Sequence, residues 1–452
     1  MIITEKVPVQ KSSRLLWIIA IGVFIVSVAS VIWAVMAHGV NVPYYDQWDR
    51  SWGEVIVSAL NGEVTIATFT EQYYQNEHRI VFTHAVTLLS AILTQWDMRF
   101  EMAINVLLCV LNAIVLTAIF RKYNPRATAW GLIIASLLTI SINQYGNLLW
   151  GFQTCWYFVV LFALLTFYCL DTSNMTYKRL GFAIFFAFCA TFSLASGLFV
   201  WFVGIVGMWV AGIRQRRYYI VWIVATVIAL ALFFSNYVLL SRGFSLEWMI
   251  RYVPIYLSGS FIPRDVFNYT LLYPFAITGL AFWRISRNSY YLWRQGHKRS
   301  LSIWIMIAGL GLVTGVVAGV RRPSLGLALD TRYATLATMF WMGFFGIIIT
   351  TNGFIRAKTF IQPKIRRLYW GNIGFLVFFL SLHIFTTFAF MPQVAQWGDT
   401  MRGYETCVLN YPTSGETECL ADLYPTTGDD YTNLTKWILQ MQERGMGPFS
   451  GE

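Results

Sequence analysis

The sequence feature that most constrains the fold is a series of apolar segments, each close to the length of a membrane span, that recurs from Leu15 to Met391. About 20 apolar residues in a helix cross the hydrocarbon core of a bilayer. Only 12% of the residues are charged, against about a quarter in soluble domains. The sequence therefore predicts an all-α polytopic protein in the lipid bilayer, with a transmembrane domain over residues 1–391. The candidate spans are residues 15–37, 80–95, 102–120, 127–142, 154–170, 180–194, 198–213, 218–240, 266–285, 301–320, 334–351 and 368–391.

Charges are divided unevenly between the connecting loops. Residues 38–79 and 392–452 hold 15 of the 22 acidic residues but only 5 of the 33 basic ones, which concentrate in residues 214–217, 284–299 and 356–367. Positively charged loops stay in the cytoplasm. We therefore expect a multi-pass protein of the cell membrane with a cytoplasmic N-terminus and a small extracytoplasmic C-terminal segment. Because loop topology accounts for the net charge of +11, the charge does not indicate nucleic-acid binding.

This orientation requires an odd number of crossings, which twelve candidate spans do not give. The segment 80–95 is short, and the segments 180–194 and 198–213 are separated only by Ala195-Ser196-Gly197. One of these segments is re-entrant, or one pair forms a single broken helix that lines a cavity. Eleven and thirteen spans both remain open.

The first external loop, residues 38–79, carries the densest polar motifs. Directly after the first apolar segment it reads Pro43-Tyr44-Tyr45-Asp46-Gln47-Trp48-Asp49, and it ends with Asn76-Glu77-His78-Arg79. Between them, residues 51–60 alternate apolar and polar positions at helical spacing, which predicts a short helix on the membrane interface. Two carboxylates among aromatic residues indicate a site. The alternative is a solvated loop whose aromatic side chains anchor at the interface.

Two further regions offer binding groups. Arg321, Arg322 and Arg332 lie in a later external loop, and the planar guanidinium fork suits a phosphate. The alternative for Arg332 is a structural pair with Asp330. In a separate loop, Trp150 and Gln153 could hold a sugar ring by stacking and hydrogen bonding, or could belong to an interfacial aromatic belt.

The C-terminal segment, residues 392–452, is too small and polar to bury much core alone. We expect it to pack over the external face and to contain a helix at residues 434–443. Cys407 and Cys419 lie there, in an oxidising compartment if the segment is external, so a disulfide between them is predicted. The other cysteines lie in apolar segments, and no cysteine spacing fits a zinc or haem site.

The layout resembles the GT-C class of membrane glycosyltransferases, which use sugars attached to polyprenyl phosphate and place an acidic residue on the first external loop. Asp46 stands at that position. The motif that contains Asp46, the Asn76–Arg79 motif and Thr331-Arg332-Tyr333 also resemble those of uncharacterised multi-pass bacterial membrane proteins. The chain departs from oligosaccharyltransferases in lacking a large soluble C-terminal domain. His78-Arg79-Ile80 also replaces the His-Pro-Pro of some relatives.

The resemblance implies a GT-C-like bundle of about 11–13 helices that moves a sugar from a polyprenyl-phosphate donor to a glycan or lipid acceptor on the extracytoplasmic face. Asp46 would be the general base. Asp49 or Glu77 would hold the acceptor or a divalent cation, Mg²⁺ or Mn²⁺. Arg332, with Arg321 or Arg322, would neutralise the leaving phosphate. The catalytic candidates are Asp46 and Asp49, and the substrate-binding candidates are Tyr45, Trp48, Glu77, His78, Arg79, Trp150, Gln153, Arg321, Arg322, Arg332 and Tyr333.

Two other functions stay open. A flippase or transporter of lipid-linked glycans would use ionisable residues at mid-membrane depth, whereas most charges here lie in loops. A polymerase or ligase of the O-antigen type would be an enzyme of similar appearance.

Overall fold

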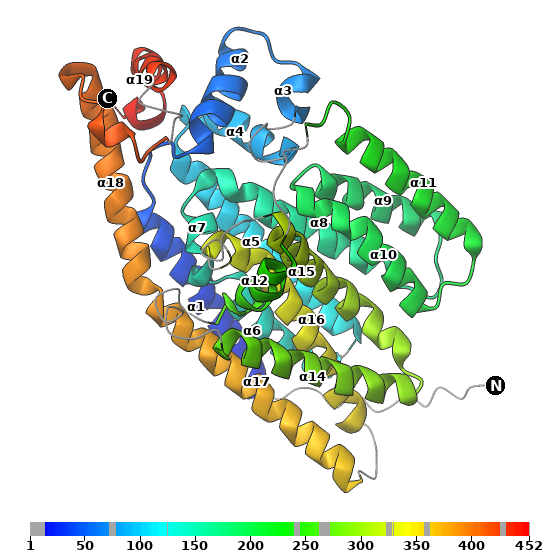
Figure 1. Ribbon diagram of the computed structural model, residues 1–452. Helices are drawn as coiled ribbons and strands as arrows, with labels where there is room; N and C mark the ends of the chain where they lie inside the picture. The colour runs from blue at the N-terminus through cyan, green and yellow to red at the C-terminus, as the bar shows by residue number, and fades with distance from the viewer. Residues whose placement is uncertain are drawn as a thin grey trace.

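The computed structural model describes a helical protein whose long helices form one bundle, with a smaller group of helices at the end where the C-terminus lies (Figure 1). All regular elements within the described ranges are helices. These ranges are residues 14–71, 78–123, 125–238, 245–261, 272–321, 328, 330–356, 362–424 and 431–451.

Each of the twelve predicted apolar segments overlaps a helix. The bundle helices are α1 (Arg14–His38), α5 (Met98–Tyr123), α6 (Thr128–Thr139), α8 (Thr154–Leu170), α9 (Tyr177–Thr191), α10 (Leu198–Ala211), α11 (Arg216–Phe233), α12 (Leu246–Ser258), α14 (Leu272–Arg294), α15 (Ser302–Arg321), α16 (Thr331–Arg356) and α17 (Pro363–Ala389). The helices of the first loop are η1 (Gln47–Ile56), α2 (Val57–Leu60) and α3 (Ile66–Thr70), and α4 (Val81–Thr94) follows this loop. The C-terminal segment forms α18 (Met391–Ser414) and α19 (Thr432–Arg444). Short helical turns include η3 (Ile142–Gln144), α7 (Tyr145–Leu148), η4 (Gly151–Gln153), η8 (Glu418–Leu420) and η9 (Gly447–Phe449).

Seven helical stretches within the described ranges are long and apolar enough to cross a membrane. The prediction of an all-α polytopic membrane protein is confirmed in this form. The stretches are Arg14–His38, Met98–Tyr123, Gly151–Leu170, Arg216–Phe233, Lys298–Val320, Thr331–Arg356 and Pro363–Ser414, and Val81–Thr94 and Ala195–Ala211 are shorter apolar helices.

Helix α16 is the centre of the bundle, since all its residues from 333 to 352 are buried. Small residues let α15 and α16 approach closely, as is typical of helices packed in a membrane. A Cβ atom added at Gly346 would lie 2.0 Å from the Trp304 ring, and one added at Gly311 would lie 2.5 Å from the backbone nitrogen of Phe340. Shape complementarity at these glycines therefore sets the distance between the two helices.

Helix α4, predicted as the span 80–95, has both ends against elements at the same end of the bundle. Arg79, just before it, donates from Nε to the carbonyl of Phe233 at the end of α11, at 2.8 Å. Gln95, just after it, accepts from the backbone N–H of Gly447 in the C-terminal segment, at 2.8 Å. Its 14 residues reach about 21 Å, less than the ~30 Å hydrocarbon core. Figure 1 shows α4 beside α2 and α3.

The C-terminal segment contains more helix than we expected. The expected helix at 434–443 is present as α19, and the residues before it form the long helix α18, which the Gly, Thr and Pro residues there did not predict. Helix α18 buries Val394, Met401 and Val408, seven residues apart, so it packs through one stripe. Helices α17 and α18 run end to end along one edge of the molecule (Figure 1).

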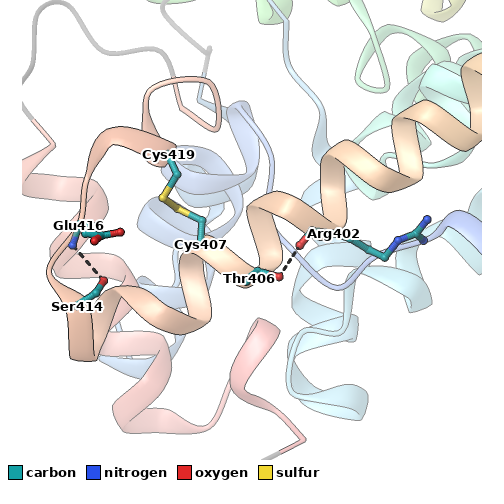
Figure 2. Close-up of a disulfide and its surroundings, with 6 residues drawn as sticks. All are labelled: Arg402, Thr406, Cys407, Ser414, Glu416 and Cys419. Atoms are coloured by element: carbon teal, nitrogen blue, oxygen red, sulfur yellow. Dashed lines mark hydrogen bonds between the residues drawn. A yellow bond between two sulfur atoms is a disulfide. The ribbon is translucent and has the colours of Figure 1, made fainter.

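A second hydrophobic core, which we call the loop–tail core, joins the first loop to the C-terminal segment. Its buried members include Trp48, Trp52, Trp96, Leu420, Leu423, Ile438 and Met441. The predicted disulfide between Cys407 and Cys419 is present, with a Cα–Cα distance of 6.2 Å, and it ties η8 to α18 (Figure 2). The helix expected at 51–60 begins earlier, at Gln47, and this core buries its apolar face.

Candidate functional site

Asp46 lies in a tight turn where the chain leaves α1 and enters η1. The backbone N–H of Gln47 donates to the carbonyl of Tyr44 at 3.1 Å, so Tyr45 and Asp46 occupy the two central positions. Tyr45 has a φ of 47°, a left-handed conformation that costs a residue with a side chain about 1–2 kcal/mol. Asp46 is half-buried. The contacts around it must therefore offset this cost and hold the carboxylate at the surface.

Three hydrogen bonds hold this turn in addition to the one between the Gln47 N–H and the Tyr44 carbonyl. The side-chain Oε1 of Gln47 accepts from the N–H of Tyr44 at 3.2 Å. Nε2 of the same amide donates to Oε2 of Glu101 on α5, at 3.0 Å. The N–H of Tyr45 donates to the carbonyl of Leu423 in the C-terminal segment, at 3.1 Å. The turn is thus fixed on one side by α5 of the bundle and on the other by the loop–tail core.

Glu101, which the sequence analysis did not select, is a buried carboxylate beneath this turn. Besides Gln47, it accepts from Nε1 of Trp96 at 3.2 Å and from the hydroxyl of Thr87 at 3.3 Å. A Cβ atom added at Gly151 would lie 2.5 Å from its Oε2, so the loop that carries Trp150 also packs directly on it. The available signal was an acidic residue at the very edge of an apolar segment, where a charge needs partners.

The loop from Ile142 to Gln153 is held between α5 and α16. Asn105 on α5 donates from Nδ2 to the carbonyl of Asn147 at 2.9 Å. Asn147 in turn donates from its own Nδ2 to the carbonyl of Arg332 at 2.7 Å. These amides lie at one end of the bundle and place Trp150 between the Asp46 turn and the start of α16.

Arg332, in the first turn of α16, lies beside this tryptophan. Its guanidinium carbon is 5.4 Å from the centroid of the Trp150 ring. Its Nη2 pairs with Oδ2 of Asp330 at 2.5 Å and its Nε contacts the same oxygen at 2.9 Å, so the structural pair we considered is present. Asp46 is close enough to Arg332 for a weak electrostatic attraction, smaller than that of Asp330. A guanidinium has five N–H donors, so this pairing leaves donors for a further anion.

An aromatic cluster, in which half-buried tyrosine and tryptophan rings pack around the buried Trp150, lies at the same point. The Tyr44 ring is 5.2 Å from Trp150, 5.5 Å from Trp397 and 6.1 Å from Tyr404, and Tyr45 is 6.3 Å from Trp150. Burial raises the pKa of Tyr44 well above its usual value, so this phenol stays neutral. Trp397 and Tyr404 belong to α18, and they were missed because no helix was predicted there.

Asp49, like Asp46, lies near Tyr424 of the C-terminal segment. Both carboxylates interact electrostatically with Tyr424, whose pKa is raised to about 12, mainly by burial and then by these two charges. Within the described ranges, no group of three or more His, Cys, Asp or Glu residues could hold a metal ion. A cation such as Mg²⁺ can instead use one or two carboxylates together with substrate phosphates, which fits the pair Asp46 and Asp49.

Other sequence candidates take different places. Trp48 is completely buried in the loop–tail core. Arg79 donates to the carbonyls of Thr70, Phe233 and Ser235, so it clamps the first loop to the end of α11. These geometries give both side chains structural roles and add no support to their assignment as substrate ligands.

The remaining sequence candidates lie near the starts of helices or outside the described residues. The Tyr333 ring packs edge-on against Trp156 at 5.3 Å, and Gln153 is buried in the turn before α8. His78 is half-buried at the start of α4. Glu77 and Arg322, and the side chain of Arg321, lie outside the described residues.

No family model matches the chain, and no curated protein matches it either. What bears on function is therefore the geometry of the site. The structure brings together Tyr45, Asp46, Trp150 and Arg332, which the sequence had selected from three separate regions, and adds Glu101 and the aromatic residues of α18.

Proposed function

We propose that this protein is an integral membrane glycosyltransferase that moves a sugar from a polyprenyl-phosphate donor to a glycan or lipid acceptor on the extracytoplasmic face. The observation that carries the proposal is the position of Arg332, whose guanidinium lies 5.4 Å from the centroid of the Trp150 ring, while that ring is 6.3 Å from Tyr45, the residue next to Asp46. Such a transfer needs an acceptor for a proton and a cation for a leaving phosphate. These two charges come from the first loop and from α16.

Asp46 acts as the general base and takes the proton from the acceptor hydroxyl. The acceptor oxygen then bonds to the anomeric carbon of the sugar, the bond from that carbon to the phosphate oxygen breaks, and the phosphate leaves with the bonding electrons. Arg332 stabilises the charge on that phosphate with the N–H groups that do not face Asp330. Asp330 in turn keeps the guanidinium oriented.

The aromatic cluster supports a sugar as the transferred group. The half-buried rings of Tyr44, Trp397 and Tyr404, which pack beside the buried Trp150, can stack on the apolar face of a sugar ring, and the neutral Tyr44 hydroxyl can hydrogen-bond to its hydroxyls. Asp49 would hold Mg²⁺ or Mn²⁺ together with the donor phosphate and so supply further positive charge there, which leaves proton transfer to Asp46.

The placement of α4 supports eleven crossings. With α4 on the external side and α12 and α14 together making one passage, the remaining helices give an odd number. That number agrees with a cytoplasmic N-terminus and an extracytoplasmic C-terminus. The loops rich in Lys and Arg then lie in the cytoplasm, and the Asp46 turn lies outside.

The test is sugar transfer by the purified protein in lipid nanodiscs, with a polyprenyl-phosphate sugar as donor. Asp46→Asn keeps the shape but removes the base, so turnover is expected to fall about 10²–10⁴-fold with little change in donor binding. Asp399→Asn is the matched control, because Asp399 is an exposed carboxylate on α18 paired with Arg402.

Full transfer by Asp46→Asn would refute the assignment of the base and leave Asp49 or Glu77 as the next candidates. Movement of the intact lipid-linked sugar across the bilayer without transfer would refute the enzyme and favour a flippase. Transfer of a preassembled glycan, rather than one sugar, would place the protein with the polymerases or ligases of the O-antigen type.

A further inference from the structure

Gln47 and Glu101 form a buried pair directly beneath the Asp46 turn. Each side chain is only 1% exposed. Their contact, Nε2 to Oε2 at 3.0 Å, joins the first loop to the first turn of α5. None of the steps assigned to Asp46 and Arg332 uses this pair, although it adjoins Asp46 in sequence.

The orientation of the Gln47 amide is fixed by the backbone. The N–H of Tyr44 can only donate, so the atom that faces it at 3.2 Å must be the oxygen of the amide. The nitrogen therefore faces Glu101, and it also contacts Sδ of Met98 at 3.1 Å. Gln47 thus closes the turn twice, through its backbone N–H and through its side-chain oxygen.

Glu101 meets donors at both of its oxygens. Oε2 receives Gln47, and Oε1 receives the indole N–H of Trp96 and the hydroxyl of Thr87. The amide of Gln47 and the indole cannot accept a hydrogen bond at the atoms that face Glu101. The position therefore requires two acceptor oxygens, which a carboxylate provides and an amide does not.

We propose that Glu101 is a positioning residue: its carboxylate fixes Gln47, and Gln47 fixes the turn that presents Asp46. The same carboxylate also supports the position of Trp150, because Gly151, the next residue in the chain, packs against Glu101. That Asp46 acts as a base rests on the proposed function, whereas the fixing of the turn by Glu101 does not. Turnover falls when a catalytic group moves by about 0.5 Å from its productive position. Loss of the hydrogen bond between Gln47 and Glu101 should therefore lower turnover.

A reciprocal exchange of the two side chains tests this role. In Glu101→Gln, the retained oxygen can still accept from Trp96 and Thr87, but the new amide nitrogen faces the nitrogen of Gln47. Turning the Gln47 amide would only move the conflict to the N–H of Tyr44. In Gln47→Glu, two carboxylates face each other. The double variant Glu101→Gln with Gln47→Glu restores a donor and an acceptor across the pair and keeps an acceptor for Tyr44.

The measurement is hydrogen–deuterium exchange over residues 44–49 in the purified full-length protein in nanodiscs. A lost bond to a charged group is expected to increase local opening, and hence exchange, at least about tenfold. Each single variant should show this increase, and the double variant should return to within about threefold of the wild type. Gln47→Ala, which removes the side chain without burying a new charge, should behave like Glu101→Gln.

Peptides from α15 and α16 provide the internal control, because general loss of structure would accelerate their exchange as well. Unchanged exchange at residues 44–49 in Glu101→Gln and in Gln47→Ala would overturn the proposal. So would a double variant that exchanges no more slowly than the single variants. If the wild type transfers sugar, kcat should fall in Glu101→Gln with little change in the donor KM, and the double variant should recover it. If the wild type transfers no sugar, the proposed function fails and the exchange data still decide the role of Glu101.

Discussion

The α15–α16 pair and the loop–tail core are both buried, but different forces hold them. Helices α15 and α16 meet through glycines and large apolar side chains, and lipid surrounding the bundle gives them little hydrophobic drive to associate. The loop–tail core buries tryptophans and leucines away from water, where the hydrophobic effect acts fully, and a disulfide and directional hydrogen bonds reinforce it. The stability of the α15–α16 contact therefore depends on complementary shape. The stability of the loop–tail core depends on the exclusion of water, on the disulfide and on hydrogen-bond geometry.

The Asp46 turn lies where these two regions meet. Glu101 of α5 holds it from the bundle, and Leu423 holds it from the loop–tail core. A change in either region should therefore reach the site by a different route. Variants in each region separate the two routes.

Removing the disulfide should affect the loop–tail core most. Cys407→Ser with Cys419→Ser opens a covalent loop with a sequence separation of 12 and should destabilise this core by about 2–3 kcal/mol. Because Leu423 then loses its fixed position, exchange at the N–H of Tyr45 should rise while α15 and α16 keep their protection. Equal loss of protection in both regions would show that they unfold as one unit.

Overfilling the helix contact should affect the bundle. Gly346→Leu places a side chain against the ring of Trp304, and such a change costs about 1–3 kcal/mol or more. The thermal unfolding midpoint of the detergent-purified protein should fall. Gly374→Leu on α17 is the control, because nothing lies within 4 Å of a Cβ atom there. Equal midpoints for the two variants would contradict the close contact.

Arg332 should influence donor binding more than folding. Arg332→Ala should weaken binding of the polyprenyl-phosphate sugar about 10–100-fold, because a phosphate loses charged hydrogen bonds. Arg332→Lys should recover only part, since lysine lacks the planar fork. Arg251→Ala, which breaks an exposed pair with Glu247 on α12, should leave binding unchanged. Unchanged binding by Arg332→Ala would show that Arg332 serves α16 alone.

Single cysteines around α4 should have the smallest effect on the protein and define its topology. Glu63→Cys and Arg99→Cys replace exposed residues on either side of α4. Both should react with a membrane-impermeant thiol reagent in intact cells, and Lys298→Cys should react only after permeabilisation. If only one of the first two reacts from outside, α4 crosses the bilayer and the count of eleven fails.

The apolar segments predicted the positions of the bundle helices because the length of an apolar run is a local property of the sequence. The disulfide was also predictable, since it followed from loop charge and compartment. Helix α18 was not, because its helical state depends on burying a stripe of three residues against distant parts of the chain. Helix α4 was counted among the candidate spans because hydropathy does not record where the two ends of a helix are bound.

The site was predicted in part for similar reasons. Asp46 and Arg332 stand out in the sequence because each is a charged residue beside an apolar segment. The GT-C resemblance then gave them complementary roles in one site. Glu101 was overlooked because its partners, Gln47, Thr87 and Trp96, are neutral side chains that no charge pattern reveals. Trp397 and Tyr404 reach the cluster only because α18 is a helix.

The end-to-end run of α17 and α18 makes the thickness of the bilayer a variable of the site. Together they span 52 residues, about 78 Å if straight, with the lower part in lipid and the upper part carrying Trp397 and Tyr404. Hydrophobic mismatch changes the tilt of a membrane helix. A tilt of about 5° at the base of such a lever moves Tyr404, which lies about 60 Å along it, by roughly 5 Å. The lipid composition around α17 is therefore expected to shift the rings of Trp397 and Tyr404 relative to the Asp46 turn.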